Sequence, residues 1–268
     1  MELGTLSLFS LAFLGLGTGF LAGLLGLGGG LSIVPFMTML FSAKGVETDL
    51  VIKLAIATSS ATILFTSVSS ARAHFKKGAV DMAILKPMAI GALLGTFIGA
   101  NFAGMLKGTA LAAFFAAFVG YSALSMLRGN KPKPGRETPH RIGLGLVGSG
   151  IGFISALLGA GGGFITVPFL TWCNVKIHTA VGISAGMGFP IALGGLVGYV
   201  LSGWGVEGLP SGAIGYIYMP ALAILVAGTM ITAPLGARVA HKINVDAMRK
   251  FFAYFLFLLA TYMFTKAF

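Results

Sequence analysis

Cysteine, acidic residues and charge in general are scarce in this sequence. Cys173 is the single cysteine among 268 residues, which excludes a disulfide within the chain and a cysteine-based metal cluster. Only 9% of the residues are charged, against about 25% in a soluble domain. Aspartate and glutamate total seven, and neither a nucleophile–base pair nor a metal-ligand spacing is visible. Catalysis is therefore poorly supported, and we expect no enzyme activity, metal or cofactor.

Nucleotide-binding signals and a secretion signal are also missing. There is no Gly-Lys-Ser/Thr phosphate loop, and the glycine-rich stretches are followed by Leu31 and Phe164, where a dinucleotide fingerprint needs a small residue. The N-terminus carries an acidic residue and no basic region, so we interpret it as a first membrane span rather than a cleaved signal peptide.

Apolar residues, in contrast, are abundant and arranged in long runs. They make up 56% of the chain, and apolar runs of about 20 residues recur along its whole length. This pattern predicts an all-α polytopic membrane protein. The net charge of +11 then reads as an orientation signal in short loops rather than a nucleic-acid-binding surface, so the expected partner is the lipid bilayer. The expected membrane segments are 4–27, 30–42, 50–70, 80–103, 108–127, 141–159, 163–173, 178–202, 213–237 and 247–265.

The two halves of the chain repeat each other. GFLAGLLGLGGGLSIVPFMTML at 19–40 matches GFISALLGAGGGFITVPFLTWC at 152–173 in twelve of twenty-two positions without a gap. The polar stretch RGNKPKPGRETPHR lies between the halves and reads as a linker. We therefore expect an N-terminal transmembrane repeat at 1–127, a basic cytoplasmic linker at 128–140 and a C-terminal transmembrane repeat at 141–268, as in many secondary transporters.

Loop charges favour an inverted relation between these repeats. If each glycine motif lay within one continuous span, there would be eight spans, with ten Lys and Arg residues inside and eight outside. If each motif is the tip of a hairpin, there are five segments in each half, with fourteen inside and four outside. The positive-inside rule favours the second arrangement, which makes the repeats inverted, although 30–42 and 163–173 are short for a full crossing.

The triple glycines are the leading candidates for a binding site. Backbone groups cannot remain unpaired in hydrocarbon, and Pro35 and Pro168 follow near the expected first turn of the next helix. Each motif thus predicts a helix N-terminus at membrane depth, whose free amides and partial positive charge suit an anion. The alternative is that these glycines serve only close helix packing. The candidate substrate-binding residues here are Gly28, Gly29, Gly30, Gly161, Gly162 and Gly163.

Hydroxyl side chains near these motifs could add donors to such a site. Ser32 and Thr166 lie just beyond the glycines and could cap the same helix ends. Thr58 and Ser59 belong to a hydroxyl cluster within an apolar segment, and Ser184 occupies the matching place in the second half. The alternative for these residues is back-bonding to the carbonyl four residues earlier in their own helix.

His74 is a candidate for proton coupling, because histidine titrates near neutral pH. The alternative is a solvated histidine at a segment end.

Four stretches together resemble the sulfite exporter TauE/SafE family, also called the TSUP permeases. They are GLLGLGGGLSIVP, AIATSS, HFKKGAVD and ALLGAGGGFITVP, and the likeness covers essentially the full chain. The resemblance implies transport of a small sulfur-containing anion, such as sulfite or a sulfonate, across the inner membrane of a prokaryote. The second-half stretch AVGISA departs from AIATSS, since Ile183 replaces the threonine, so the two sides of the site differ chemically.

Three functions remain open at this point. The chain could be an alternating-access carrier, an anion channel with the same site, or, from a different class, a membrane scaffold or embedded enzyme.

Overall fold

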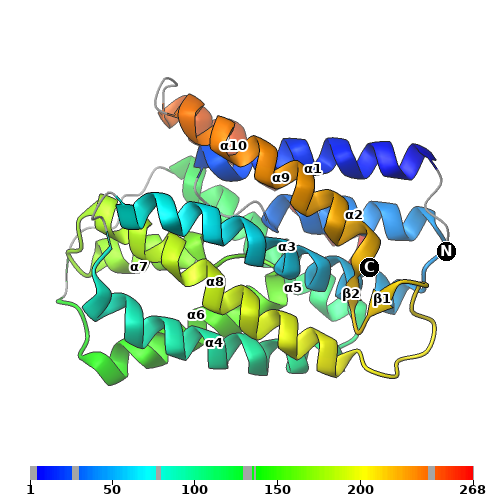
Figure 1. The fold of residues 1–268 in the computed structure, drawn as a ribbon, viewed down its shortest axis with the longest axis horizontal. Coiled ribbons are helices and arrows are strands. Elements are labelled where there is room, and N and C mark those ends of the chain that lie inside the picture. The colour runs from blue at the N-terminus through cyan, green and yellow to red at the C-terminus, as the bar shows by residue number, and fades with distance from the viewer. Residues whose placement is uncertain are drawn as a thin grey trace.

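The chain folds into a bundle of helices that run roughly along one common axis (Figure 1). The computed structural model describes residues 5–25, 30–76, 80–128, 135, 137–240 and 245–267. Within these residues there are ten α-helices and one short β-hairpin: α1 Thr5–Leu25, α2 Gly30–Ala43, α3 Thr48–Lys76, α4 Met82–Met105, α5 Gly108–Arg128, α6 Arg141–Leu158, α7 Gly163–Trp172, α8 Ile177–Ser202, β1 Ala213–Ile214, β2 Ile217–Tyr218, α9 Met219–Ala240 and α10 Val245–Ala267.

Six of these helices are long and apolar enough to cross a membrane. They are α4, α5, α6 and α8 over their full lengths, together with Thr48–Arg72 of α3 and Met219–Gly236 of α9. A helix of about 20 residues spans the 30 Å hydrocarbon core. Large apolar side chains on the outer surface, such as Phe13 with 79% and Ile142 with 71% of its area exposed, suit contact with lipid rather than water. The predicted all-α polytopic membrane fold is therefore confirmed.

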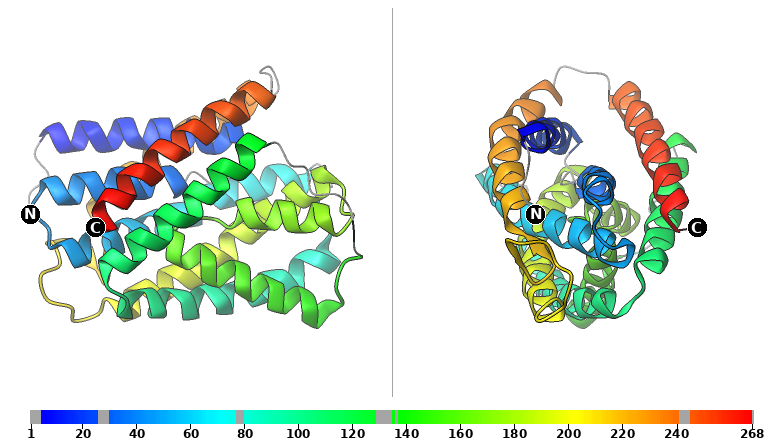
Figure 2. Two further views of the ribbon diagram at one scale, coloured as in Figure 1. Left: turned by 180° about the vertical axis from the view of Figure 1, so that it is seen from behind. Right: turned by 90° about the vertical axis from the view of Figure 1, so that its right-hand side faces the viewer.

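Each glycine motif separates two helices. α1 ends at Leu25 and α2 begins at Gly30, while α6 ends at Leu158 and α7 begins at Gly163. The described turn between α6 and α7, and the opposite directions of α1 and α2 (Figures 1 and 2), show that the arrangement with one continuous span through each motif is wrong. At 14 and 10 residues, α2 and α7 are about 21 and 15 Å long, which is shorter than the hydrocarbon core. Both helices thus extend only part of the way across.

The expected segment 213–237 does not begin as a helix. Ala213 pairs with Tyr218 and Ile214 with Ile217 in an antiparallel hairpin, and α9 starts only at Met219. Gly215 forms the turn with φ 55°, and a Cβ there would lie 2.6 Å from the Tyr199 carbonyl oxygen at the end of α8. The apolar run was correctly recognised, but a turn that only glycine fits shortens the helix by six residues.

Helix pairs from the two halves pack in matching ways. α4 packs on α6 and α1 packs on α9, while α3 packs on α8 and α5 on α10. Glycines allow the closest approaches: a Cβ on Gly95 would overlap the Ser149 carbonyl in α6, and one on Gly19 would overlap Thr232 and Thr229 in α9. Small residues at such contacts let membrane helices approach closely, which is how these interfaces are held without a hydrophobic driving force.

The directions of the helices place the two chain termini together. α1 begins and α10 ends at the same end of the bundle, whereas α6 begins at the opposite end (Figures 1 and 2). α2 runs from the interior toward the end that holds the termini, and α7 runs from the interior toward the other end (Figure 1). The N-termini of both short helices therefore lie inside the bundle.

Candidate functional site

The start of α2 touches the turn that leads into α7. A Cβ on Gly30 would overlap the Gly159 carbonyl oxygen and lie 3.1 Å from the Ala160 Cα, so the two backbones meet without any side chain between them. Ile63 of α3 closes the contact, with its Cδ1 atom 2.9 Å from the same position. We call this contact, between Gly30 and Gly159–Ala160, the glycine junction. It brings the two copies of the motif together in the interior.

A buried hydroxyl from α3 binds both sides of the glycine junction. Ser59 Oγ donates to the Gly159 carbonyl at 2.8 Å, and the Gly30 carbonyl lies at 3.3 Å. Ser59 has no exposed surface, so this hydrogen bond is shielded from water. A hydroxyl has one proton, so the shorter contact is the stronger bond and the longer one is secondary.

The second motif places free amides at the start of α7. Gly159 ends α6 in the left-handed conformation with φ 61°, and Gly162 precedes α7 with φ 74°. The Gly162 carbonyl accepts hydrogen bonds from the amides of Ile165 and Thr166. Within the described residues, the amides of 161–164 donate to no backbone carbonyl. They point out of a helix N-terminus, which carries a partial positive charge.

The prolines lie deeper in these short helices than the sequence predicted. Pro35 and Pro168 are each the sixth residue of their helix, one turn beyond the first. Because proline has no N–H, the carbonyls of Leu31 and Phe164 have no donor four residues later. Each short helix therefore lacks one backbone hydrogen bond in its first turns.

Two buried hydroxyls without a hydrogen-bond partner flank the glycine junction. Ser32 lies in the first turn of α2 and Ser155 in the last turns of α6, and neither residue has any exposed surface. Ser155 Oγ is 3.0 Å from the position that a Cβ on Gly162 would take. Leaving a buried hydroxyl unpaired costs about 1–3 kcal/mol, so such groups call for an explanation.

Ser32 is among the residues predicted from the sequence, whereas Ser155 is not. Ser155 aligns with Ala22 in the first copy of the motif, so a comparison that looks for shared residues passes over it. The signal that could have found Ser155 is a difference between the repeats: it is a lone hydroxyl in the apolar run ISALLG, seven residues before Gly162.

The other predicted hydroxyls have partners or lie elsewhere. Thr58 accepts a hydrogen bond from the Tyr218 amide at 3.1 Å and so fastens the β-hairpin to α3. The Thr166 hydroxyl donates a hydrogen bond to the Gly162 carbonyl at 2.9 Å, which is the back-bonding expected as the alternative. Ser184 is buried in α8, a helix that packs along α3. Gly28 and Gly29 lie outside the described residues.

His74 is remote from the glycine junction. It follows Ser59 in the same helix by fifteen residues, a distance of about 22 Å along α3. The structure therefore does not bring it together with the other candidate residues.

Near the end that holds the termini, α3 carries an ion pair between the buried Lys53 and the partly exposed Asp49. The Lys53 ammonium contacts the Asp49 carboxylate at 2.7 Å and lies 5.8 Å from the centre of the Tyr216 ring. The second oxygen of Asp49 accepts a hydrogen bond from the Gly108 amide at the start of α5. Asp49 therefore neutralises Lys53 and caps α5, which leaves it without capacity for other cations nearby.

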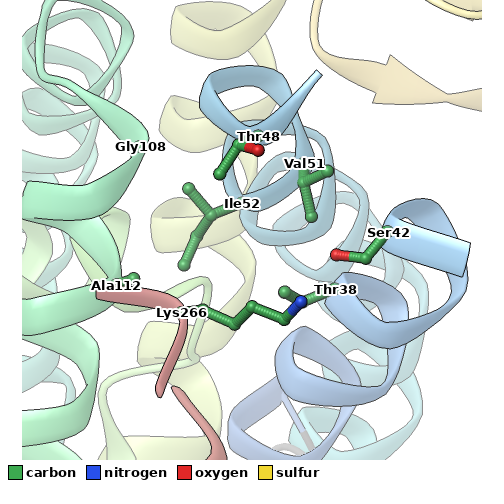
Figure 3. Close-up of a pocket in the computed structure, with 8 residues that line it drawn as sticks. All are labelled: Thr38, Ser42, Thr48, Val51, Ile52, Gly108, Ala112 and Lys266. Atoms are coloured by element: carbon green, nitrogen blue, oxygen red, sulfur yellow. The ribbon is translucent and has the colours of Figure 1, made fainter. Parts of the chain in front are cut away.

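A small pocket opens beside this ion pair, between α2, α3, α5 and α10 (Figure 3). The Lys266 side chain extends into it toward Thr38, and Ser42 and Thr48 add hydroxyls to its wall (Figure 3). Among the described residues, Lys266 has no carboxylate partner. The pocket thus carries a net positive charge, in contrast to the neutral glycine junction. No group of three or more metal-ligating side chains occurs in the described part of the chain.

A polytopic helical bundle in which two short helices begin in the interior is an architecture found in membrane transporters. Comparison with known proteins agrees. Residues 11–263 match the family Sulfite exporter TauE/SafE, so the chain belongs to this family.

The similar proteins are described as transporters. A probable membrane transporter protein of Haemophilus influenzae is 38% identical over 92% of this chain and 94% of its own length. The probable membrane transporter protein MJ0441 of Methanocaldococcus jannaschii is 25% identical over 89% of this chain and 88% of its own length. The probable membrane transporter protein YunE of Bacillus subtilis is 27% identical over 91% of this chain and 92% of its own length. No solved structure matches the chain.

Proposed function

We propose that this protein is a permease, not an enzyme, that moves a small sulfur-containing anion such as sulfite or a sulfonate across the inner membrane. The observation that carries the proposal is the glycine junction, where the start of α2 meets the turn that leads to the free amides of α7, with the unpaired hydroxyls of Ser32 and Ser155 in the adjoining turns. The family name supports the sulfur-containing substrate.

The chemistry of the junction favours an anion that must also leave again. A helix N-terminus stabilises a negative charge by about 0.3–1 kcal/mol, and by up to about 2 kcal/mol in a buried site. A hydrogen bond from an amide or hydroxyl to a charged group adds about 1.5–3 kcal/mol. Because the contacts described at the junction include no lysine or arginine, the bound anion is held without a full opposite charge. Binding of that strength selects anions over cations and still permits release.

The packing of the helices supports transport by two inverted repeats, 1–127 and 141–268. The pairs α4–α6 and α1–α9 exchange places under such a symmetry, and α3–α8 and α5–α10 map onto themselves. With the linker 128–140 in the cytoplasm, fourteen of the eighteen Lys and Arg residues lie on that side. Rocking of one repeat against the other would open the junction to each side in turn.

A flux assay with matched glycine variants tests the proposal. Purified protein in proteoliposomes should move labelled sulfite or a sulfonate, and no movement of any anion in a broad sulfur panel would refute it. Gly162→Val should abolish flux, because the side chain would lie within about 3 Å of Ile191 and Ser155 at the start of α7. Gly205→Val is the control, since Gly205 has the same φ of 74° but no atom within 4 Å of its Cβ position.

Gly161→Val is a second test variant, needed because Gly162→Val could lose flux simply by failing to fold. The nearest atom to its Cβ position is Ile63 Cγ2 at 3.5 Å, an ordinary contact, so the variant should fold and still narrow the space beside the free amides. If the two single variants Gly161→Val and Gly162→Val both kept full activity, the substrate would bind elsewhere.

A further inference from the structure

Three buried side-chain hydroxyls in the described part of the chain have no hydrogen-bond partner: those of Ser32, Ser155 and Ser202. Buried polar groups are nearly always paired, so each of the three calls for a reason. Two of them lie on either side of the glycine junction, and the third lies at the far end of α8.

Close packing accounts for Ser202. Its Cβ and Oγ lie 2.8 and 3.0 Å from the Cβ position of Gly104, where α8 crosses α4, so only a small residue fits there. An alanine would satisfy this position equally well, and the hydroxyl has no evident purpose.

Position distinguishes Ser155 from Ser202. The Ser155 carbonyl accepts a hydrogen bond from the Ala160 amide, so Ser155 is held by the turn that leads into α7. Its hydroxyl adjoins Gly162, the residue that precedes the free amides of α7. α7 has ten residues, enough for an established helix dipole at that end. The unpaired hydroxyl and the unpaired amides thus lie at one helix N-terminus.

Ser32 belongs to the helix on the other side of the glycine junction. It is two residues beyond Gly30, in the first turn of α2, and Gly30 itself touches Gly159 and Ala160. The two serines are not repeat counterparts: Ala22 aligns with Ser155, and Ile165 aligns with Ser32. Each half of the chain therefore supplies one hydroxyl from a different element, α2 in the first and α6 in the second.

We propose that Ser155 and Ser32 are specificity-determining residues that donate hydrogen bonds to one bound oxyanion from the two halves of the protein. This inference rests on the proposed function and narrows its substrate class. The ligand has at least two acceptor oxygens, as sulfite and sulfonates do, because two separated donors must each reach one. Halides, which cannot present separate oxygens, gain less from this pair. The unequal positions of the two serines give the bound anion one preferred orientation.

Alanine substitution separates a ligand-binding role from a structural one. We expect Ser155→Ala and Ser32→Ala to weaken binding of sulfite and methanesulfonate by about tenfold or more, because each loses a hydrogen bond to a charged group. Bromide binding should change less than threefold. Ser202→Ala, which removes a third hydroxyl whose oxygen is buried and unpaired, should bind all three anions as the wild type does. The measurement is the anion-dependent shift in melting temperature of the purified protein.

Thermal stability without anion provides the internal check. Removing an unpaired buried hydroxyl should leave the melting temperature equal or higher in all three alanine variants. Equal anion affinity of Ser155→Ala and the wild type would overturn the inference for Ser155, and the same result for Ser32→Ala would overturn it for Ser32.

Cysteine reactivity tests the same inference without any assumption about the substrate. In a Cys173→Ser background, Ser155→Cys and Ser32→Cys should react at least threefold faster with an anionic methanethiosulfonate, which carries a sulfonate, than with the cationic trimethylammonium reagent. Ser202→Cys should show no such preference. Two inert cysteines, or faster reaction with the cation, would overturn the inference. If the anionic preference holds but the wild type transports no anion, the anion site stands and the transport proposal fails alone.

Discussion

The contact between Gly30 and the turn after α6 makes a strong prediction about a single methyl group. Gly30→Ala places a Cβ against the Gly159 carbonyl oxygen, 3.1 Å from the Ala160 Cα and 2.9 Å from Ile63 Cδ1. Two of these three neighbours are backbone atoms, which cannot rotate away. The backbones of the two halves must therefore separate, which also strains the hydrogen bond from Ser59.

The expected cost follows from two opposing effects. Overpacking of a well-packed interior costs about 1–3 kcal/mol, whereas glycine to alanine within a helix gains about 0.5–1 kcal/mol. Gly150→Ala isolates the second effect, because Gly150 lies within α6 and nothing lies within 4 Å of its Cβ position. The stability of Gly30→Ala should thus fall below that of Gly150→Ala by about 1–3 kcal/mol.

Unfolding of the purified variants in a mild detergent, followed by circular dichroism, measures this difference. Flux in proteoliposomes should fall for Gly30→Ala and remain normal for Gly150→Ala. If Gly30→Ala proved as stable and as active as Gly150→Ala, the two motifs would not be in contact, and the account of the junction would be refuted.

Three further predictions concern the bond at the junction, the charged pocket and the orientation. Ser59→Ala should destabilise the protein by about 1–3 kcal/mol in the same unfolding assay, because it leaves the buried Gly159 carbonyl unpaired, and an unchanged midpoint would contradict this. Lys266→Gln should raise the KM for anion flux about two- to threefold at low salt, an effect that should vanish at high salt, because its charge attracts anions to that end; Lys107→Gln is the control outside the pocket wall. In a Cys173→Ser background, Glu207→Cys should react with an impermeant thiol reagent on intact cells, and Glu137→Cys only after permeabilisation. The reverse pattern would show that the linker faces outward.

The sequence was sufficient to predict the number and order of the helices. The triple glycines and their duplication indicated a break, and loop charge favoured five segments in each half. These signals are local: clustered glycines weaken a helix through the freedom of their own backbone, and the loop charges are counted along the sequence. The β-hairpin at 213–218 could not be predicted in the same way, because its strands have only two residues each and depend on Gly215 packing against α8 and on the Tyr218 amide binding Thr58.

The candidate site was predictable in its backbone and less so in its side chains. The structure places Gly30 against Gly159 and Ala160 in the turn before α7, whereas the expectation that the amides of the two motifs face one another across a cavity stays a prediction. Which hydroxyls face the junction depends on contacts between residues far apart in the chain. Ser59, one of five hydroxyl residues in the stretch 58–66, proved to bind two carbonyls, and Ser155 was hidden because its repeat counterpart is alanine.

The two contacts of Ser59 have a consequence for movement. One hydroxyl proton serves two carbonyl oxygens, at 2.8 Å on the second motif and 3.3 Å on the first. Rotation about the Cβ–Oγ bond turns the hydroxyl hydrogen from one carbonyl oxygen toward the other, and no covalent bond is broken. When the halves slide by a few tenths of an ångström, the favoured acceptor changes while the number of hydrogen bonds stays the same. A sliding motion at this point therefore keeps one hydrogen bond across the contact between the halves, and only its acceptor changes.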